Sequence, residues 1–176
     1  MRQPSSRWAN KAAGSSDAKA VEAAAVRLLA RREHSVDELR RKLAGKGYPP
    51  ETIEPVIEKL AGKRLVSDER FTSSFVHHHA KRGQGPVRIR AALRQQGIPA
   101  SQVEETLRGA EIDWVQLARE VRRRKFGAGS PRSLGERAKQ ARFLQYRGFD
   151  AEQLRAALRN ESGEEDGAPD ITLEVE

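Results

Sequence analysis

The sequence predicts an all-α fold, an elongated tandem array of three three-helix repeats with about nine helices. Three observations support this prediction. Three stretches of the chain resemble one another, glycines recur in them at a nearly constant spacing, and apolar residues follow the glycines at helical intervals. The chain of 176 residues is 37% hydrophobic and 33% charged, a balance that suits thin helical modules better than one thick globule, and we find no convincing strand.

Each repeated stretch runs leucine, three residues, glycine, an apolar residue, proline or aspartate, and then an amphipathic helix. The stretches are LAGKGYPPETIEPVIEKL (43–60), LRQQGIPASQVEETL (93–107) and LQYRGFDAEQLRAAL (144–158). Their glycines, Gly47, Gly97 and Gly148, are 50 and 51 residues apart. Such regularity is the signature of tandem modules.

The residues around each glycine explain how one module is built. Glycine adopts the left-handed conformation needed after a helix C-terminus, and Pro49–Pro50, Pro99 or Asp150 then turns the chain and starts the next helix. Ser35 with Glu38 forms a possible capping box for the helix before the first glycine. A longer helix is expected ahead of each pair, at about 18–32, 68–82 and 113–126.

These elements divide the chain into five segments. We expect a flexible N-terminal segment (1–17), three helical repeats (18–64, 65–109 and 110–160) and an acidic, disordered tail (161–176). The loop GAGSPRS (127–133) is the longest internal break and the expected hinge.

Composition narrows the class of protein. The absence of cysteine excludes disulfides and cysteine-based zinc sites and favours a reducing compartment. No apolar run approaches the roughly 20 residues needed to span a bilayer, and the first residues lack the apolar middle of a signal peptide. We therefore expect a cytoplasmic protein with no membrane partner.

Charge is unevenly distributed. Residues 161–176 hold seven acids and no base, and the rest of the chain holds 33 basic and 18 acidic residues, a formal charge of +15. A basic body suggests a polyanionic partner, either nucleic acid or an acidic protein surface, and the alternative is that arginine-rich helices only keep the protein soluble.

The repeat pattern together with LVSDERFTSSFV (65–76), GPVRIRAALRQQGI (85–98) and RRRKFG (122–127) resembles the RecX family over about residues 20–160. Members of this family are bacterial regulators of the RecA recombinase. The resemblance implies an elongated protein of three tandem three-helix repeats. It also implies binding to RecA and to RecA–single-stranded DNA filaments, with inhibition of recombinase, ATPase and co-protease activities, and thus modulation of DNA repair and the SOS response. Thr72 and the histidines at 77–79 depart from the residues common in the family.

His77, His78 and His79 are consecutive, so on a helix they point in three directions. A helical metal pair needs ligands four residues apart, and none stands at that spacing from His78 or His79. We expect no metal site. Phe75 and His79 should face inward and His77 outward, which leaves a local structural role or part of a partner surface.

Basic residues follow the histidines. Lys81 and Arg82 fall in the last turn of a helix, where the macrodipole favours cations by about 0.3–1 kcal/mol. Arg88, Arg90 and Arg94 lie on the next helix, and Arg90 and Arg94 share a face. Arg90 and Arg94, together with the corner of Lys81 and Arg82, could form a basic ridge. With Arg88 they are our candidate residues for binding RecA or DNA, and the alternative is a solvated helix face.

RRRKFG is the densest basic cluster. Arg122 and Lys125 extend the apolar stripe of their helix, whereas Arg123 and Arg124 point away from it and are the better candidates for a partner contact.

Two function hypotheses remain. The chain lacks a phosphate-binding GxxxxGK[ST] loop, HExxH and a cysteine nucleophile, so we expect no enzyme and no cofactor. The first hypothesis is a regulator, expected to be a monomer, that binds across adjacent RecA subunits on DNA. The second is a helical protein that binds DNA directly and acts without RecA.

Overall fold

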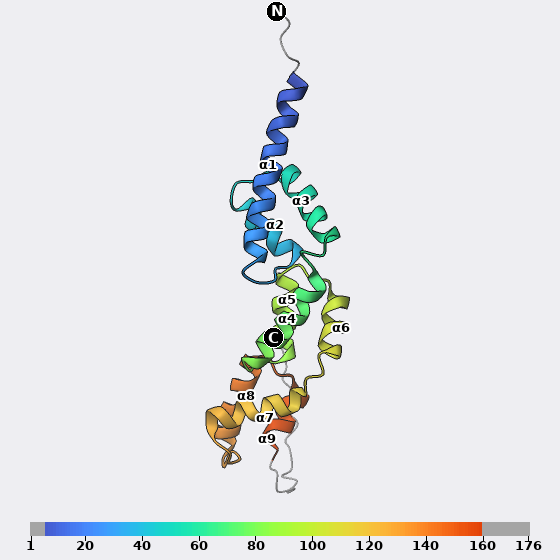
Figure 1. Cartoon of the computed structure of the whole chain (residues 1–176). Coiled ribbons are helices and arrows are strands. Elements are labelled where there is room, and N and C mark those ends of the chain that lie inside the picture. The colour runs from blue at the N-terminus through green and yellow to red at the C-terminus, as the bar shows by residue number, and fades with distance from the viewer. Residues whose placement is uncertain (1–5, 160–176) are drawn as a thin grey trace, which may run out of the picture.

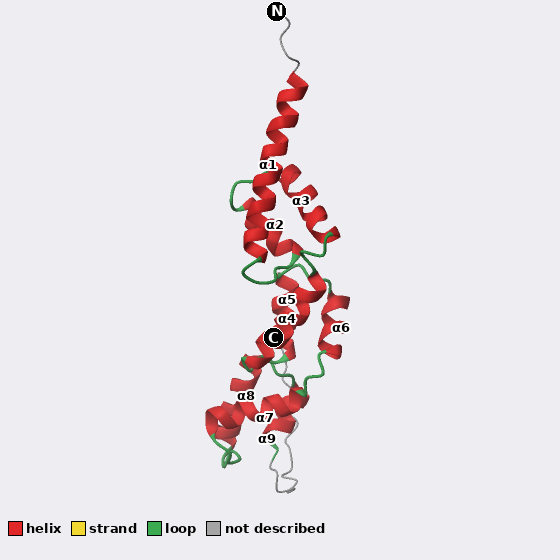
Figure 2. Ribbon diagram, viewed as in Figure 1, coloured by secondary structure: helices red, strands yellow, loops and turns green. Residues whose placement is uncertain are grey.

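The computed structural model describes the backbone of residues 6–159 and the side chains of residues 17–159. The described residues form nine α-helices and no strand (Figure 2). The helices are α1 (Ser6–Leu29), α2 (Val36–Ala44), α3 (Pro50–Gly62), α4 (Asp68–Lys81), α5 (Pro86–Gln95), α6 (Ala100–Gly109), α7 (Trp114–Phe126), α8 (Leu134–Arg147) and α9 (Ala151–Leu158). They follow one another as three three-helix repeats along one long axis (Figure 1), which confirms the predicted fold class.

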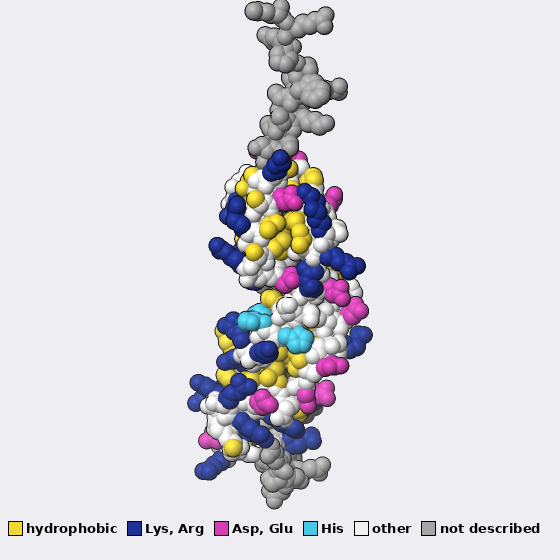
Figure 3. Space-filling model, viewed as in Figure 1, with side chains coloured by type: hydrophobic (Ala, Val, Ile, Leu, Met, Phe, Trp, Pro, Cys, Tyr) yellow, Lys and Arg dark blue, Asp and Glu magenta, His cyan; other side chains and the backbone are white. Residues whose placement is uncertain are grey.

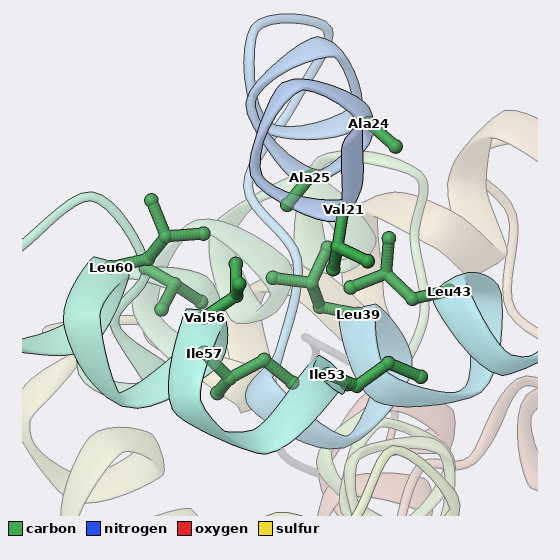
Figure 4. Close-up of a cluster of buried hydrophobic side chains, with 10 residues drawn as sticks. Val21, Ala24, Ala25, Leu39, Leu43, Ile53, Val56, Ile57 and Leu60 are labelled. Carbon is green, nitrogen blue, oxygen red and sulfur yellow. The ribbon is translucent and has the colours of Figure 1, made fainter. Parts of the chain in front are cut away.

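Each repeat has its own hydrophobic core. The first is built by Val21 of α1, Leu39 and Leu43 of α2, and residues of α3 such as Ile53 and Leu60 (Figure 4). The second repeat gathers eight buried residues of its own and the third gathers five. The third core is the smallest of the three, and Arg122 and Gln140 are also buried in that repeat.

The repeated glycines end α2, α5 and α8 as the sequence predicts. Gly47, Gly97 and Gly148 have φ angles of 87°, 78° and 90°, the left-handed region that favours glycine. After each one, the next amide donates back to the carbonyl of the repeated leucine, for example Phe149 N to Leu144 O at 3.2 Å. This bond closes the helix end and turns the chain toward the third helix of the repeat.

Two local predictions need correction. Helix α1 begins at Ser6, twelve residues before the expected start, so residues 6–17 continue a helix rather than form a flexible lead-in. Alanine-rich sequence after residue 8 has high helix propensity and accounts for this extension. Ser35 caps α2 by accepting from Glu38 N at 3.0 Å, but the Glu38 carboxylate pairs with Arg32 instead of returning to the cap, so only half of the capping box forms. The expected tail (161–176) lies outside the described residues.

The repeats join through one recurring contact. In each case, the turn after the second helix of one repeat packs on the start of the second helix of the preceding repeat. At the first junction, Ser35 Oγ, just before α2, donates to Gln96 O, just after α5, at 2.8 Å. At the second, Val87 N of α5 donates to Gly148 O, just after α8, at 3.0 Å. A Cβ on Gly148 would lie 2.3 Å from the Cβ of Arg88, so only glycine permits this approach.

No helix of the described part of the chain is long and apolar enough to cross a membrane.

Candidate partner-binding site

The corner between α4 and α5 exposes two of the predicted binding residues. Arg82 caps α4, and Gly83, with a φ of 73°, turns the chain toward Pro86 at the start of α5. The side chains of Lys81 and Arg82 both extend into solvent. On the face shown in Figure 3, Lys and Arg side chains gather beside and below the histidines.

The third repeat docks directly against this corner. Gly85 N donates to Arg147 O at 2.9 Å, so the backbone of the corner bonds to the end of α8. Arg147 Nη1 in turn donates to Arg82 O at 3.0 Å and satisfies a carbonyl at the end of α4. Its guanidinium also lies 5.3 Å from the centre of the Phe143 ring. The junction therefore places residues of α4, α5 and α8 in one surface.

Arg88 makes the matching contact in the other direction. Its Nη1 donates to Tyr146 O at 3.2 Å, where the negative end of the α8 macrodipole favours a cation. The same guanidinium lies 5.3 Å from the centre of the exposed Tyr146 ring. We define the junction surface as Lys81, Arg82, Arg88, Tyr146 and Arg147.

Arg90 has a different environment from the one predicted. Its guanidinium forms a two-pronged ion pair with Glu104 of α6, with Nε–Oε1 at 2.6 Å and Nη2–Oε2 at 2.9 Å. The first repeat holds the equivalent pair, Arg40 with Glu54, at the same two distances. Hydrogen bonding to Arg90 lowers the pKa of Glu104, and the nearby charges of Arg94 and Arg108 add to the effect. Arg90 thus holds α5 against α6. Of the two arginines predicted to share a face of α5, Arg94 is the one that is exposed.

The basic cluster RRRKFG at the end of α7 has one buried arginine, Arg122, followed by three exposed cations. Arg122 is only 6% exposed, and it donates to Gly129 O at 2.8 Å, to Ala128 O at 3.4 Å and to Gln140 Oε1 at 3.3 Å. Arg123 and Arg124 are exposed, and Arg124 pairs with Glu120 at 3.4 Å. Lys125 is exposed, in contrast to the buried Arg122 with which it was grouped. The hydrogen bond of Arg124 goes to Glu120 of the same helix, so it does not join Arg124 to the junction surface.

The three histidines lie where the helical geometry predicts. His77 is exposed, and His79 is half-buried against Phe75, with ring centres 3.9 Å apart and planes inclined by 22°. His79 Nδ1 lies 2.7 Å from Gln84 Oε1, which ties the end of α4 to the corner. Across the described residues, no group of three or more His, Cys, Asp or Glu side chains could hold a metal ion.

A groove of about 550 Å³ lies on another side of the same junction, between α6 and α9. Its walls carry Arg90 and Arg108 but also Glu104, Asp113 and Asp150. Because charges of both signs line it, this groove is a poorer site for a polyanion than the junction surface.

Sequence reasoning missed Tyr146 and Arg147. Both immediately precede Gly148, the third repeated glycine, so their helical position was predictable. Their contact with Arg82 and Arg88 depends on how two repeats dock, which a single chain sequence does not specify.

The comparisons with known proteins agree with this architecture. Three family models match in order: the first three-helix domain of RecX over residues 23–60, the second over 67–107 and the third over 111–158. The chain belongs to the RecX family. The regulatory protein RecX of Halorhodospira halophila is 48% identical over 151 residues, covering 86% of this chain and 94% of its own. The regulatory protein RecX of Pseudomonas savastanoi pv. phaseolicola is 42% identical over 146 residues, covering 83% and 94%.

Solved RecX structures share the fold at lower identity. The crystal structure of RecX from Lactobacillus salivarius is 21% identical with a TM-score of 0.69, covering 81% of this chain and 95% of its own. A second crystal structure, of a regulatory protein RecX, is 20% identical with a TM-score of 0.74, covering 89% and 78%. The three-repeat RecX architecture and a RecX-type regulatory role follow for this chain.

Proposed function

We propose that this protein binds RecA and the RecA–single-stranded DNA filament and inhibits the recombinase, ATPase and co-protease activities of RecA. Such an activity modulates DNA repair and the SOS response in the cytoplasm. The observation that carries the proposal is the ordered match of all three RecX domains along the chain. The proposed role is that of a regulator, not an enzyme, acting as a monomer.

The shape of the molecule supports this mode of action. Three repeats stacked along one axis extend the contact surface along a partner that is itself repetitive (Figure 1). Several weak contacts on one chain reinforce one another, because the first contact raises the effective concentration of the others. A protein that bridges neighbouring RecA subunits in this way would oppose the subunit movements on which filament turnover depends.

Exposed cations supply the contacts in this proposal. Lys81, Arg82 and Arg88 lie in the junction surface, Arg94 is exposed on α5, and Arg123 and Arg124 are exposed on α7. Arg90 belongs to the predicted ridge, and its pairing with Glu104 makes it the weakest member of the set. A polyanionic filament attracts such a surface through its phosphates and through acidic side chains.

The test is the rate of ATP hydrolysis by RecA on single-stranded DNA as this protein is added. We expect inhibition at amounts at or below one molecule per RecA subunit. A protein bearing glutamine at Lys81, Arg82 and Arg88 should inhibit less than one bearing glutamine at Lys42, Lys46 and Lys63, which are exposed cations of the first repeat. Absence of inhibition by the unaltered protein at stoichiometric amounts would refute the proposal.

Direct binding to DNA without RecA is the second candidate function, favoured by the four cations of the junction surface. It predicts tight, salt-sensitive DNA binding to which RecA adds nothing.

A further inference from the structure

Tyr146 has an unusual exposure. It lies in the last turn of α8, and 76% of its surface is open to solvent. Among the described side chains, from residue 17 to residue 159, it is the one exposed Phe, Trp or Tyr. The ring contributes to none of the three cores, and the group that lies over it is the guanidinium of Arg88.

The cations around this ring lack acidic partners. Most arginines that pair in this protein do so with Asp or Glu, as Arg40 and Arg90 do. Arg88 and Arg147 instead donate to backbone carbonyls, which satisfy a hydrogen bond but leave the positive charge uncompensated. Lys81 and Arg82 form no ion pair with any carboxylate in the described part of the chain. One exposed aromatic ring therefore lies under the Arg88 guanidinium, at a junction that holds three further positive charges without a carboxylate partner.

The first junction shows that this chemistry is not needed to join two repeats. There, Arg41 donates to Gln95 O at 3.3 Å, just as Arg88 donates to Tyr146 O, and each carbonyl lies two residues before a repeated glycine. Arg41, however, also pairs with Asp37 at 2.8 Å, and the exposed side chain is the amide of Gln95. The same kind of arginine–carbonyl contact is thus surrounded by different side chains at the two junctions. At the first, they are the amide of Gln95 and an arginine paired with Asp37; at the second, they are the Tyr146 ring and cations without a carboxylate partner.

We propose that the junction surface is a binding site for single-stranded nucleic acid, in which the Tyr146 ring stacks on a base and Lys81, Arg82, Arg88 and Arg147 contact the adjoining phosphates. Stacking on an aromatic side chain contributes about 1–3 kcal/mol per base and does not depend on sequence. The phosphates fill the remaining donors of the arginines, because Arg88 and Arg147 each use one N–H for a carbonyl.

A single strand fits this surface better than a duplex or an acidic protein. Bases in a duplex are stacked on one another and present no free face, whereas an unpaired base offers one. Carboxylates of an acidic protein surface would pair with the cations but offer no flat face on which the Tyr146 ring could stack. This inference rests on the proposed function in one respect, since the single strand it contacts in the cell would be the one held by RecA.

The experiment measures binding of the full chain to a short fluorescent oligothymidylate by anisotropy, without RecA. We expect Tyr146→Ala to weaken binding about 5- to 150-fold and Tyr146→Phe to retain it. Gln95→Ala, at the equivalent position of the first junction, is the matched control and should bind as the unaltered protein does. Replacing Lys81 and Arg82 with glutamine should lower the slope of log affinity against log salt by about 0.7 for each phosphate that the variant no longer binds.

RecA ATPase assays on the same variants separate this inference from the proposed function. Equal oligothymidylate binding by Tyr146→Ala and Gln95→Ala would overturn the nucleic-acid site, even if RecA inhibition were intact. Loss of RecA inhibition in Tyr146→Ala, with no oligothymidylate binding by the unaltered protein, would assign the surface to a protein contact and also overturn it. Oligothymidylate binding that depends on Tyr146, in a protein that leaves RecA unaffected, would support the site and refute the proposed function.

Discussion

Alanine substitution at two of the repeated glycines tests how much the repeat junction contributes to stability. Gly47 and Gly148 have nearly the same backbone conformation, with φ angles of 87° and 90°, so alanine imposes the same strain of about 1–2 kcal/mol at both. Around Gly47, a Cβ would meet no atom within 4 Å, because no other repeat of the described chain packs on this glycine. At Gly148 it would lie 2.3 Å from the Cβ of Arg88 and 2.6 Å from its amide nitrogen. Only the second change forces two repeats apart.

The extra cost at Gly148 follows from the interactions that separation would break. Overpacking costs about 1–3 kcal/mol, and the bonds from Gly85 N to Arg147 O and from Val87 N to Gly148 O contribute about 1 kcal/mol each. We therefore expect Gly148→Ala to lower the free energy of unfolding by about 3–5 kcal/mol more than Gly47→Ala. Urea unfolding followed by circular dichroism measures both values, and hydrogen exchange at the amides of Gly85 and Val87 locates the loss. Equal destabilisation by the two substitutions would refute the docking geometry.

Three further predictions concern single side chains. Removing the Glu104 carboxylate in Glu104→Gln should destabilise the protein by less than about 1 kcal/mol near neutral pH. The pairing with Arg90 lowers the pKa of Glu104, so the ion pair contributes to the free energy of unfolding above the unfolded-state pKa of about 4.3. In urea titrations this contribution should disappear as the pH falls below about 4.3 and through the lower pKa of the folded state. Burial lowers the pKa of His34, so its neutral form is favoured in the fold; stability should drop as the pH falls below about 6.5, and His34→Gln should flatten that part of the profile. Replacing Arg122 with methionine removes its bonds to the loop carbonyls of Ala128 and Gly129, and trypsin should then cut the loop at 127–133 several-fold faster than in the unaltered protein; unchanged cleavage would count against Arg122 as the loop's anchor.

The repeat architecture was predictable because its signals are local. Gly47, Gly97 and Gly148 each end a helix through their own backbone conformation, and the residues that follow start the next helix within a few positions. The partial burial of His79 and the exposure of His77 were likewise predictable, since helical geometry alone fixes their directions relative to Phe75.

The composition of the candidate site was only half predictable because it depends on residues distant in sequence. Arg90 and Arg94 share a helix face, but the Glu104 that pairs with Arg90 lies 14 residues away on another helix. The backbone carbonyl of Tyr146 accepts from Arg88 across 58 residues, and its ring meets the same guanidinium. The packing of helices and repeats determines these partners. The sequence pattern alone does not reveal which basic side chain is paired within the protein and which remains available for a binding partner.

A structure of the protein bound to a RecA–single-stranded DNA filament tests the central claim most directly, and crosslinking from position 146 gives the same information at lower resolution. We expect the second and third repeats to lie against the filament, with the junction surface within contact distance of the DNA strand or of RecA. A bound complex in which Lys81, Arg82, Arg88 and Tyr146 all face solvent would contradict the account.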